Sequence, residues 1–401
     1  MAEDYLAVQV TTIQALEIAI KIYHLEGEIL ALPGDEDFNF RIKDKEESYI
    51  LKVSRPNADL AYLEYQQELL TYLKTDSQSI TPAPIPDVEG NKISTITDSS
   101  GKTRLVRLLS WIDGRLWSSI NPRNDKLLLS IGLQTGMLTK ALQGFDHKSA
   151  HRENEWDIAQ AAWTFNYQHL FSDDQQAILR SFQEAFKDIQ PGLNELRKSV
   201  VHNDANDNNV IVTDDLVNPE VKAIIDFGDA IYTPIINDLA ITIAYAIMHK
   251  PDALAASLPI IKGYNKAFPL QEDELLMLHT LVAMRLTISV IKSAINRTKE
   301  PDNKYLLISE KPAWEVLEKW HKINKHFATY SFRLACGLDA HPEEKVFAKW
   351  AEKTSVNLQT MVPEVAFKNV HSPDMSVGST FLGNTSEFTD INFLAYKRNL
   401  I

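Results

Sequence analysis

The most informative stretch of this sequence is Val201-His202-Asn203-Asp204-Ala205-Asn206-Asp207-Asn208-Asn209-Val210-Ile211-Val212. It combines the spacing His-x-Asp-x-x-x-x-Asn with a short apolar run that has the character of a strand. A second motif, Asp226-Phe227-Gly228, follows the apolar run Ala223-Ile224-Ile225. Either pattern alone is a weak signal, but two such patterns at short range, each beside a predicted strand, are far more specific.

The residue types in these motifs suit the transfer of a phosphoryl group to a hydroxyl. That reaction needs a carboxylate near the attacking hydroxyl and oxygen ligands for Mg²⁺. We expect Asp204 to orient the hydroxyl and accept its proton, and Asn209 and Asp226 to hold the metal. His202 is expected to anchor the loop rather than to shuttle protons, because the metal-assisted reaction does not require a histidine. The alternative is that Asp204, Asp207 and Asn208 are turn-formers in an exposed loop and that Asp226 begins a turn.

The first 109 residues have the pattern of a small antiparallel sheet. Alternating runs at 38–42 and 48–53 flank a charged turn, and those at 92–97 and 103–109 flank a hairpin signal. One helix is predicted within this sheet, over 58–73, where leucines recur on a common stripe. These residues are therefore expected to form a β-rich N-terminal lobe.

Helical periodicity dominates from residue 110 onward. It covers 127–142, 156–170, 174–187, 192–198 and 237–353, and only the runs at 210–212 and 221–225 look like strands. We therefore predict an α+β fold with two lobes, the N-terminal one over 1–109 and a larger, mostly helical one over 110–361. The polar segment 362–401 is expected to be a C-terminal tail or an inter-domain linker.

Composition narrows the class of partner. The chain has 401 residues, 41 basic and 54 acidic, and a formal net charge of −13. Such a charge disfavours nucleic acid and anionic membranes and suits a small cationic substrate. Cys336 is the single cysteine, and the sequence shows no secretory signal. No apolar run approaches the length of about 20 residues that a membrane span needs. We therefore predict a cytoplasmic protein. The longest apolar candidates lie around 241–248 and 127–133.

The two motifs together resemble the catalytic segments of the aminoglycoside phosphotransferase-like kinases, small-molecule relatives of the protein kinases. The resemblance extends over residues 25 to 355 and implies the two-lobed protein-kinase-like fold, Mg²⁺, and ATP or GTP as co-substrate. Within this family, several segments look like the choline and hydroxylysine kinase-like group, and most like its hydroxylysine kinase branch. They are 34–40, Glu64-Tyr65-Gln66, Trp156-Asp157 and 333–338.

The resemblance also implies roles for residues outside the two motifs. Lys52 matches the strand lysine that contacts the α- and β-phosphates, and Gly34 and Asn39 lie in the nucleotide-binding loop. Asp238 matches a position that supports the catalytic loop, although it could equally cap a helix.

Two departures from the family pattern stand out. The loop 34–40 has one glycine and three acids, Asp35, Glu36 and Asp37, which we expect to turn outward or to aid metal binding. The helix partner of Lys52 is ambiguous among Glu64, Gln66 and Glu68, and Glu68 is favoured here.

For function, the branch implies phosphorylation of the side-chain hydroxyl of an amino alcohol or a hydroxylated amino acid. Choline, ethanolamine, homoserine or an aminoglycoside are alternative acceptors. A further alternative is a kinase fold without turnover that binds nucleotide or amino alcohol for a neighbouring enzyme. The segment 373–379 is similar to the linker of large bacterial fusions, which leaves open covalently linked downstream domains.

Overall fold

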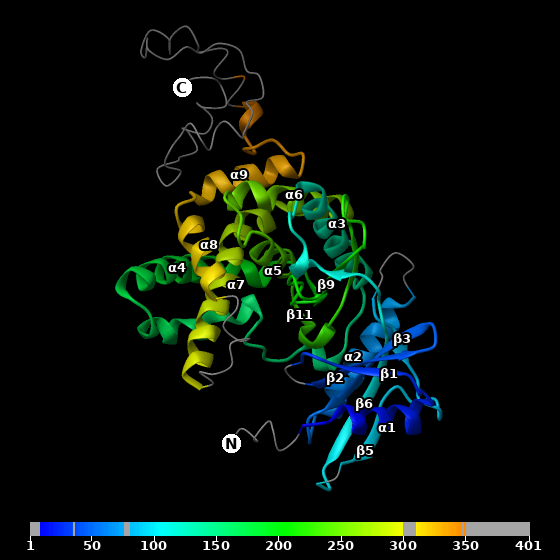
Figure 1. The fold of residues 1–401 in the computed structure, drawn as a ribbon. Coiled ribbons are helices and arrows are strands. Elements are labelled where there is room, and N and C mark those ends of the chain that lie inside the picture. The colour runs from blue at the N-terminus through cyan, green and yellow to red at the C-terminus, as the bar shows by residue number, and fades with distance from the viewer. Residues whose placement is uncertain are drawn as a thin grey trace, which may run out of the picture.

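The computed structural model describes residues 9–34, 37–75, 81–98, 100–299 and 310–346, together with residue 349. It has the expected α+β fold with a small antiparallel sheet in one lobe and a mostly helical second lobe (Figure 1). The segment 362–401, expected as a tail or linker, lies outside the described residues. The boundary between residues 109 and 110 stays a prediction.

The N-terminal lobe is one six-stranded antiparallel sheet with the order β1-β2-β3-β6-β4, in which β5 also pairs with β6. Its strands are β1 (Glu28–Leu32), β2 (Asp37–Asp44), β3 (Glu47–Ser54), β4 (Pro84–Ile85), β5 (Ser94–Thr97) and β6 (Thr103–Ser110). Asn39 is paired with Lys52, and Lys52 with Arg107. Directly paired residues project from the same face, so these three polar side chains share one face of the sheet.

The opposite face of the sheet is apolar and is covered by α1 (Thr12–Tyr23). This helix begins with a capping box between Thr11 and Gln14 and packs Ala15 and Ala19 into the core of the lobe. The lobe therefore has one helix ahead of the sheet in the chain and another within it. The predicted helix is α2 (Leu60–Leu73), which begins at the N-cap Asp59 and lies in the part of the lobe nearer the helical lobe (Figure 1).

The C-terminal lobe is built mainly from helices around a large apolar core. Its α-helices are α3 (Asp125–Ala141), α4 (Asp173–Glu195), α5 (Ile236–Ala246), α6 (Ala253–Ala267), α7 (Glu272–Lys299), α8 (Glu310–His321) and α9 (Lys325–Ala335). Short 3₁₀ helices are η2 (Trp117–Ser119), η3 (Lys148–Ala150), η4 (Ile158–Leu170) and η5 (Phe227–Asp229). Two helical predictions need correction: residues 158–170 form a 3₁₀ helix, and 192–198 is divided between the end of α4 and a strand.

Two small antiparallel sheets carry the sequence motifs. One has the order β10-β9-β7 and the other pairs β11 with β8. Their strands are β7 (Arg115–Leu116), β8 (Lys198–Val201), β9 (Val210–Val212), β10 (Val221–Ile224) and β11 (Ile231–Pro234). The loop from β8 to β9 contains the first motif, and the loop from β10 to β11 contains the second. β9 and β11 lie on the side of the helical lobe that faces the N-terminal sheet (Figure 1).

The longest apolar helix is α7 and not one of the two runs picked out in the sequence. Residues Glu272–Thr298 are long and apolar enough to cross a membrane by length and composition. An 18-residue window of this helix has a mean hydropathy of 1.6, but 89% of that window is buried inside the protein. Such burial is typical of a core helix that is apolar on most of its faces.

The helices α3 and α6 approach each other closely through glycines. A Cβ added to Gly132 would overlap the carbonyl group of Ile260. We expect Gly132→Ala to lower the free energy of unfolding by roughly 1–3 kcal/mol, because backbone cannot move aside as a side chain can. Chemical denaturation measures this change. Gly192→Ala is the matched control, since its Cβ would meet only the flexible end of Met277, and an equal loss in both variants would contradict the explanation.

Candidate active site

The loop between β8 and β9 brings Asp204 and Asn209 into direct contact. The Nδ2 atom of Asn209 donates to Oδ2 of Asp204 at 2.7 Å and to its carbonyl oxygen at 3.0 Å. The backbone of Asn209 is fixed as well, because its carbonyl accepts from the N–H of Ile225 at 2.9 Å. The Asp-x-x-x-x-Asn spacing thus closes a compact loop whose two functional side chains face each other.

His202 joins the two motifs. It is completely buried, its Nδ1 accepts from the N–H of Asp204 at 3.2 Å, and its Nε2 lies 2.9 Å from the carbonyl oxygen of Ile225. Its ring packs edge-on against Phe227 at 4.7 Å. Burial lowers the pKa of His202. Because Nδ1 accepts from the N–H of Asp204, the proton is on Nε2, which donates to Ile225.

Asp238 supports the same loop from α5. Its Oδ1 accepts from the N–H of Asn203 at 2.9 Å, and Asn203 has a φ of 64°, a left-handed conformation that costs energy for a residue with a side chain. Burial raises the pKa of Asp238 to about 7. Asp238 does not cap α5, because it lies in the first turn and the N-cap residue is Ile235.

Arg285 is a site residue that the sequence interpretation missed. It comes from α7, its side chain is 2% exposed, and it donates to Oδ1 of Asp204 at 2.8 Å. It also donates to the carbonyl oxygen of Trp156 at 2.9 Å and lies over the Trp156 ring. Burial raises the pKa of Asp204 to about 7, and the Arg285 guanidinium acts in the opposite direction. A single arginine inside the apolar run 281–291 was the available signal.

Arg285→Leu is expected to lower kcat by roughly 100-fold, because Asp204 loses the donor that fixes its carboxylate. Nucleotide KM should change little, since Arg285 donates to Oδ1 of Asp204, whereas the proposed metal ligand Asn209 donates to Oδ2. Arg285→Lys, which keeps the positive charge, should recover part of kcat. Steady-state kinetics separates these effects, and a loss confined to KM, or no rescue by lysine, would contradict the positioning role.

Lys52 connects the two lobes. Its Nζ lies 3.9 Å from Oδ1 of Asp226, in the loop after β10, and 3.6 Å from Oδ2 of Asp37, at the start of β2. The Lys52 ammonium lowers the pKa of Asp226, whose side chain is 52% exposed. Asp226 has a φ of 62° and accepts from the N–H of Gly228. The structure thus places a cation and a carboxylate from the two lobes side by side.

The helix residues expected beside Lys52 lie elsewhere. Glu68, the favoured partner, is 61% exposed and lies 3.8 Å from Nε2 of His147. Glu64 is exposed, and buried Gln66 accepts from Arg107. Within the described residues, the carboxylates that face Lys52 are Asp37 and Asp226, so the preference for Glu68 is wrong.

In the loop before β2, the acidic residue Asp37 does not point in the expected direction. Asp37 turns inward: its side chain is 12% exposed and pairs with Arg107 as well as Lys52, which corrects the expectation that it turns outward. Asp35 and Glu36 lie outside the described residues. Asn39 donates to the carbonyl oxygen of Pro33 at 3.2 Å. A Cβ on Gly34 would overlap the Asn39 amide, so glycine permits this close turn.

The donor set suits Mg²⁺. Because Nδ2 of Asn209 donates to Asp204, its amide oxygen is the atom left to bind a cation, and Asp226 supplies a carboxylate. In the described part of the chain there is no cluster of three His, Cys, Asp or Glu side chains suited to a metal. Two protein oxygens fit Mg²⁺, which commonly takes one or two carboxylates and completes its shell with water and phosphate oxygens.

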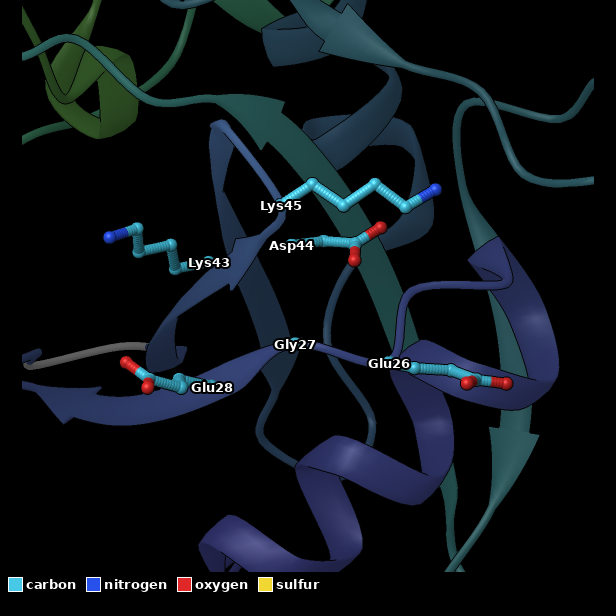
Figure 2. Close-up of a pocket in the computed structure, with 6 residues that line it drawn as sticks. All are labelled: Glu26, Gly27, Glu28, Lys43, Asp44 and Lys45. Atoms are coloured by element: carbon cyan, nitrogen blue, oxygen red, sulfur yellow. The ribbon is translucent and has the colours of Figure 1, made fainter.

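A hollow on the N-terminal sheet lies apart from these residues. It is lined by Glu26, Gly27, Glu28, Lys43, Asp44 and Lys45, whose charged side chains spread outward in different directions (Figure 2). Asp44 ends β2, and Asp37 begins it. The hollow therefore lies at the opposite end of this strand from Asp37 and Lys52.

The fold and the site together define a class of protein. A small antiparallel sheet carries a lysine that faces an Asp-Phe-Gly aspartate, and the adjoining loop carries an aspartate and an asparagine in contact. This arrangement is that of the two-lobed kinase-like phosphotransferases.

Comparison with known proteins gives the family. The model of the phosphotransferase enzyme family matches residues 28–264, and the chain belongs to this family as a small-molecule kinase. The hydroxylysine kinase of Mus musculus is 28% identical over 324 residues, covering 73% of this chain and 84% of the mouse protein. That of Bos taurus is 26% identical over 335 residues, covering 77% and 88%.

Solved structures show the same fold at lower identity. An amicoumacin kinase in complex with AMP-PNP and Ca²⁺ has a TM-score of 0.60 and 19% identity, covering 80% of this chain and 96% of that one. A microcompartment-associated aminopropanol kinase has a TM-score of 0.59 and 18% identity, covering 82% and 100%. These likenesses confirm the predicted two-lobed fold.

Proposed function

We propose that this protein transfers the γ-phosphoryl group of ATP or GTP, with Mg²⁺, to the hydroxyl of a hydroxylated amino acid or amino alcohol of the hydroxylysine type. The observation that carries the proposal is the convergence of four side chains. Asp204 contacts Asn209 at 2.7 Å, and Lys52 faces Asp226 at 3.9 Å across the two lobes.

Each of these side chains has a task that its chemistry suits. Asp204 orients the acceptor hydroxyl and takes its proton, and Lys52 binds the α- and β-phosphates. Asn209 and Asp226 hold Mg²⁺, which offsets the charge on the phosphate oxygens when it is bound. Gly34 and Asn39 shape the loop above the nucleotide, and His202 and Asp238 keep the Asp204 loop in place.

The proposed class of acceptor is supported by the net charge of the protein and by the names of its relatives. The net charge of −13 favours a cationic substrate over an anionic one. The curated relatives that match most of this chain are named hydroxylysine kinase, and one solved neighbour is an aminopropanol kinase. Hydroxylysine, an amino acid with a second ammonium beside its hydroxyl, combines these features and is the first acceptor to test.

A coupled assay tests the proposal. Hydroxylysine, ethanolamine, choline, homoserine and an aminoglycoside are each supplied with ATP and with GTP, in the presence and absence of Mg²⁺. We expect turnover with hydroxylysine and none without Mg²⁺. Nucleotide binding without turnover on any acceptor would instead support the alternative, a kinase fold that binds its ligand for a neighbouring enzyme.

A further inference from the structure

We propose that Asp37 is the positioning residue for Lys52, taking over from β2 the task that a helix glutamate performs in protein kinases. The inference rests on the proposed function, because it assigns Lys52 to the nucleotide phosphates. It also explains how a phosphate loop with acidic residues can serve a nucleotide site: at least one of those acids faces a cation.

The sheet register puts Asp37 on the correct face. Asn39 is paired with Lys52, and residues two apart on a strand project from the same side. Asp37 therefore shares the polar face with Lys52 and with Arg107, the partner of Lys52 on β6. From there its Oδ2 reaches 3.6 Å from the Lys52 ammonium.

Arg107 also holds the Asp37 carboxylate. Its side chain is 2% exposed and donates to the Asp37 carboxylate through one terminal nitrogen and to Gln66 through the other. Gln66 lies on α2 and is itself buried. The Arg107 guanidinium, which comes from β6, therefore joins Asp37 on β2 to Gln66 on α2. A neutral amide on the helix cannot supply the negative charge that Lys52 requires, and Asp37 supplies it.

Loss of this carboxylate has a specific consequence for Lys52. The other described carboxylate within reach is Asp226 at 3.9 Å, which the proposed function assigns to Mg²⁺. Without Asp37, the lysine is drawn onto Asp226 and away from the phosphates. The expected defect is therefore in nucleotide use, and the KM for the acceptor should change little.

The test compares Asp37→Asn with wild type, using nucleotide kinetics at saturating acceptor. We expect kcat/KM for the nucleotide to fall roughly tenfold to a hundredfold. Glu68→Gln is the matched control, because Glu68 is exposed and lies beside His147, and it should behave as wild type. If Asp37→Asn keeps wild-type kcat/KM, the inference is overturned while the proposed function stands.

A second pair of variants separates positioning from folding. Asp37→Asn leaves Arg107 buried without a carboxylate, which can destabilise the lobe. Arg107→Gln alone keeps the Asp37–Lys52 pair, and Arg107→Gln with Asp37→Asn removes both charges. We expect the double variant to use nucleotide at least tenfold worse than Arg107→Gln alone. Equal kinetics in these two variants would assign Asp37 a structural role only.

If wild type turns over no acceptor, the proposed function fails. The role of Asp37 is then tested separately, by measuring nucleotide binding. Titration with a non-hydrolysable ATP or GTP analogue should then show weaker binding by Asp37→Asn than by wild type and Glu68→Gln. Unchanged affinity would overturn the role assigned to Asp37.

Discussion

Asp204→Asn is expected to lower kcat by roughly 100- to 10,000-fold, the range typical of losing a general base. The amide keeps the shape of the carboxylate, and its single oxygen can still accept from Arg285, although its NH₂ group cannot accept from Asn209. The bond from Asn209 to the backbone carbonyl of residue 204 remains, so the loop should stay in place. The amide cannot take a proton from the acceptor hydroxyl. Nucleotide affinity should therefore remain close to wild type, which isothermal titration measures alongside the steady-state rate.

Asp207→Asn is the matched control for this variant. Asp207 lies in the same loop, but its carboxylate pairs with Arg123 at 2.7 Å and does not face Asn209. Turnover should be within a few-fold of wild type. A comparable loss of kcat in both variants would mean that any change of charge in this loop is harmful, and that Asp204 has no special task.

Asp226→Asn should have the second largest effect, a fall in kcat of roughly 100-fold or more, because a carboxylate that holds a divalent cation contributes several kcal/mol. The Mg²⁺ concentration needed for half-maximal rate should rise. The variant also frees Lys52 from its partner across the lobes. Rates measured over a Mg²⁺ titration check this, and an unchanged Mg²⁺ dependence would contradict the assignment of Asp226 to the metal.

The fold class and the contacts around the two motifs could be predicted because their signals are local. Alternation at 38–42 and 48–53 indicated β2 and β3, and the Asp-x-x-x-x-Asn spacing indicated a loop that brings its own ends together. Residues 158–170 are helical as predicted, but their hydrogen bonds are of the 3₁₀ type. A period of 3.0 and one of 3.6 are hard to distinguish over so short a segment.

The ion pairs could not be predicted as readily, because they join residues far apart in the chain. Arg285 meets Asp204 because α7 packs into the helical core. Its place in an apolar run indicates that it is buried, but nothing in the local sequence identifies its partner. Asp37 is different. The short turn between β2 and β3 sets Asn39 opposite Lys52, and hairpin register follows from turn length. The prediction that Asp37 turns outward was wrong because the register places its carboxylate beside two cations, Lys52 and Arg107.

The central claim is that Lys52, Asp204, Asn209 and Asp226 form one phosphoryl-transfer site. The most direct measurement incubates wild type and Asp204→Asn with γ-labelled ATP or GTP, Mg²⁺ and hydroxylysine, and follows the label into the acceptor by mass spectrometry. We predict phosphorylated hydroxylysine from wild type, dependent on Mg²⁺, and nearly none from Asp204→Asn. Label that reaches the acceptor equally fast in both proteins, or that reaches no hydroxylated amine at all from wild type, would contradict the account.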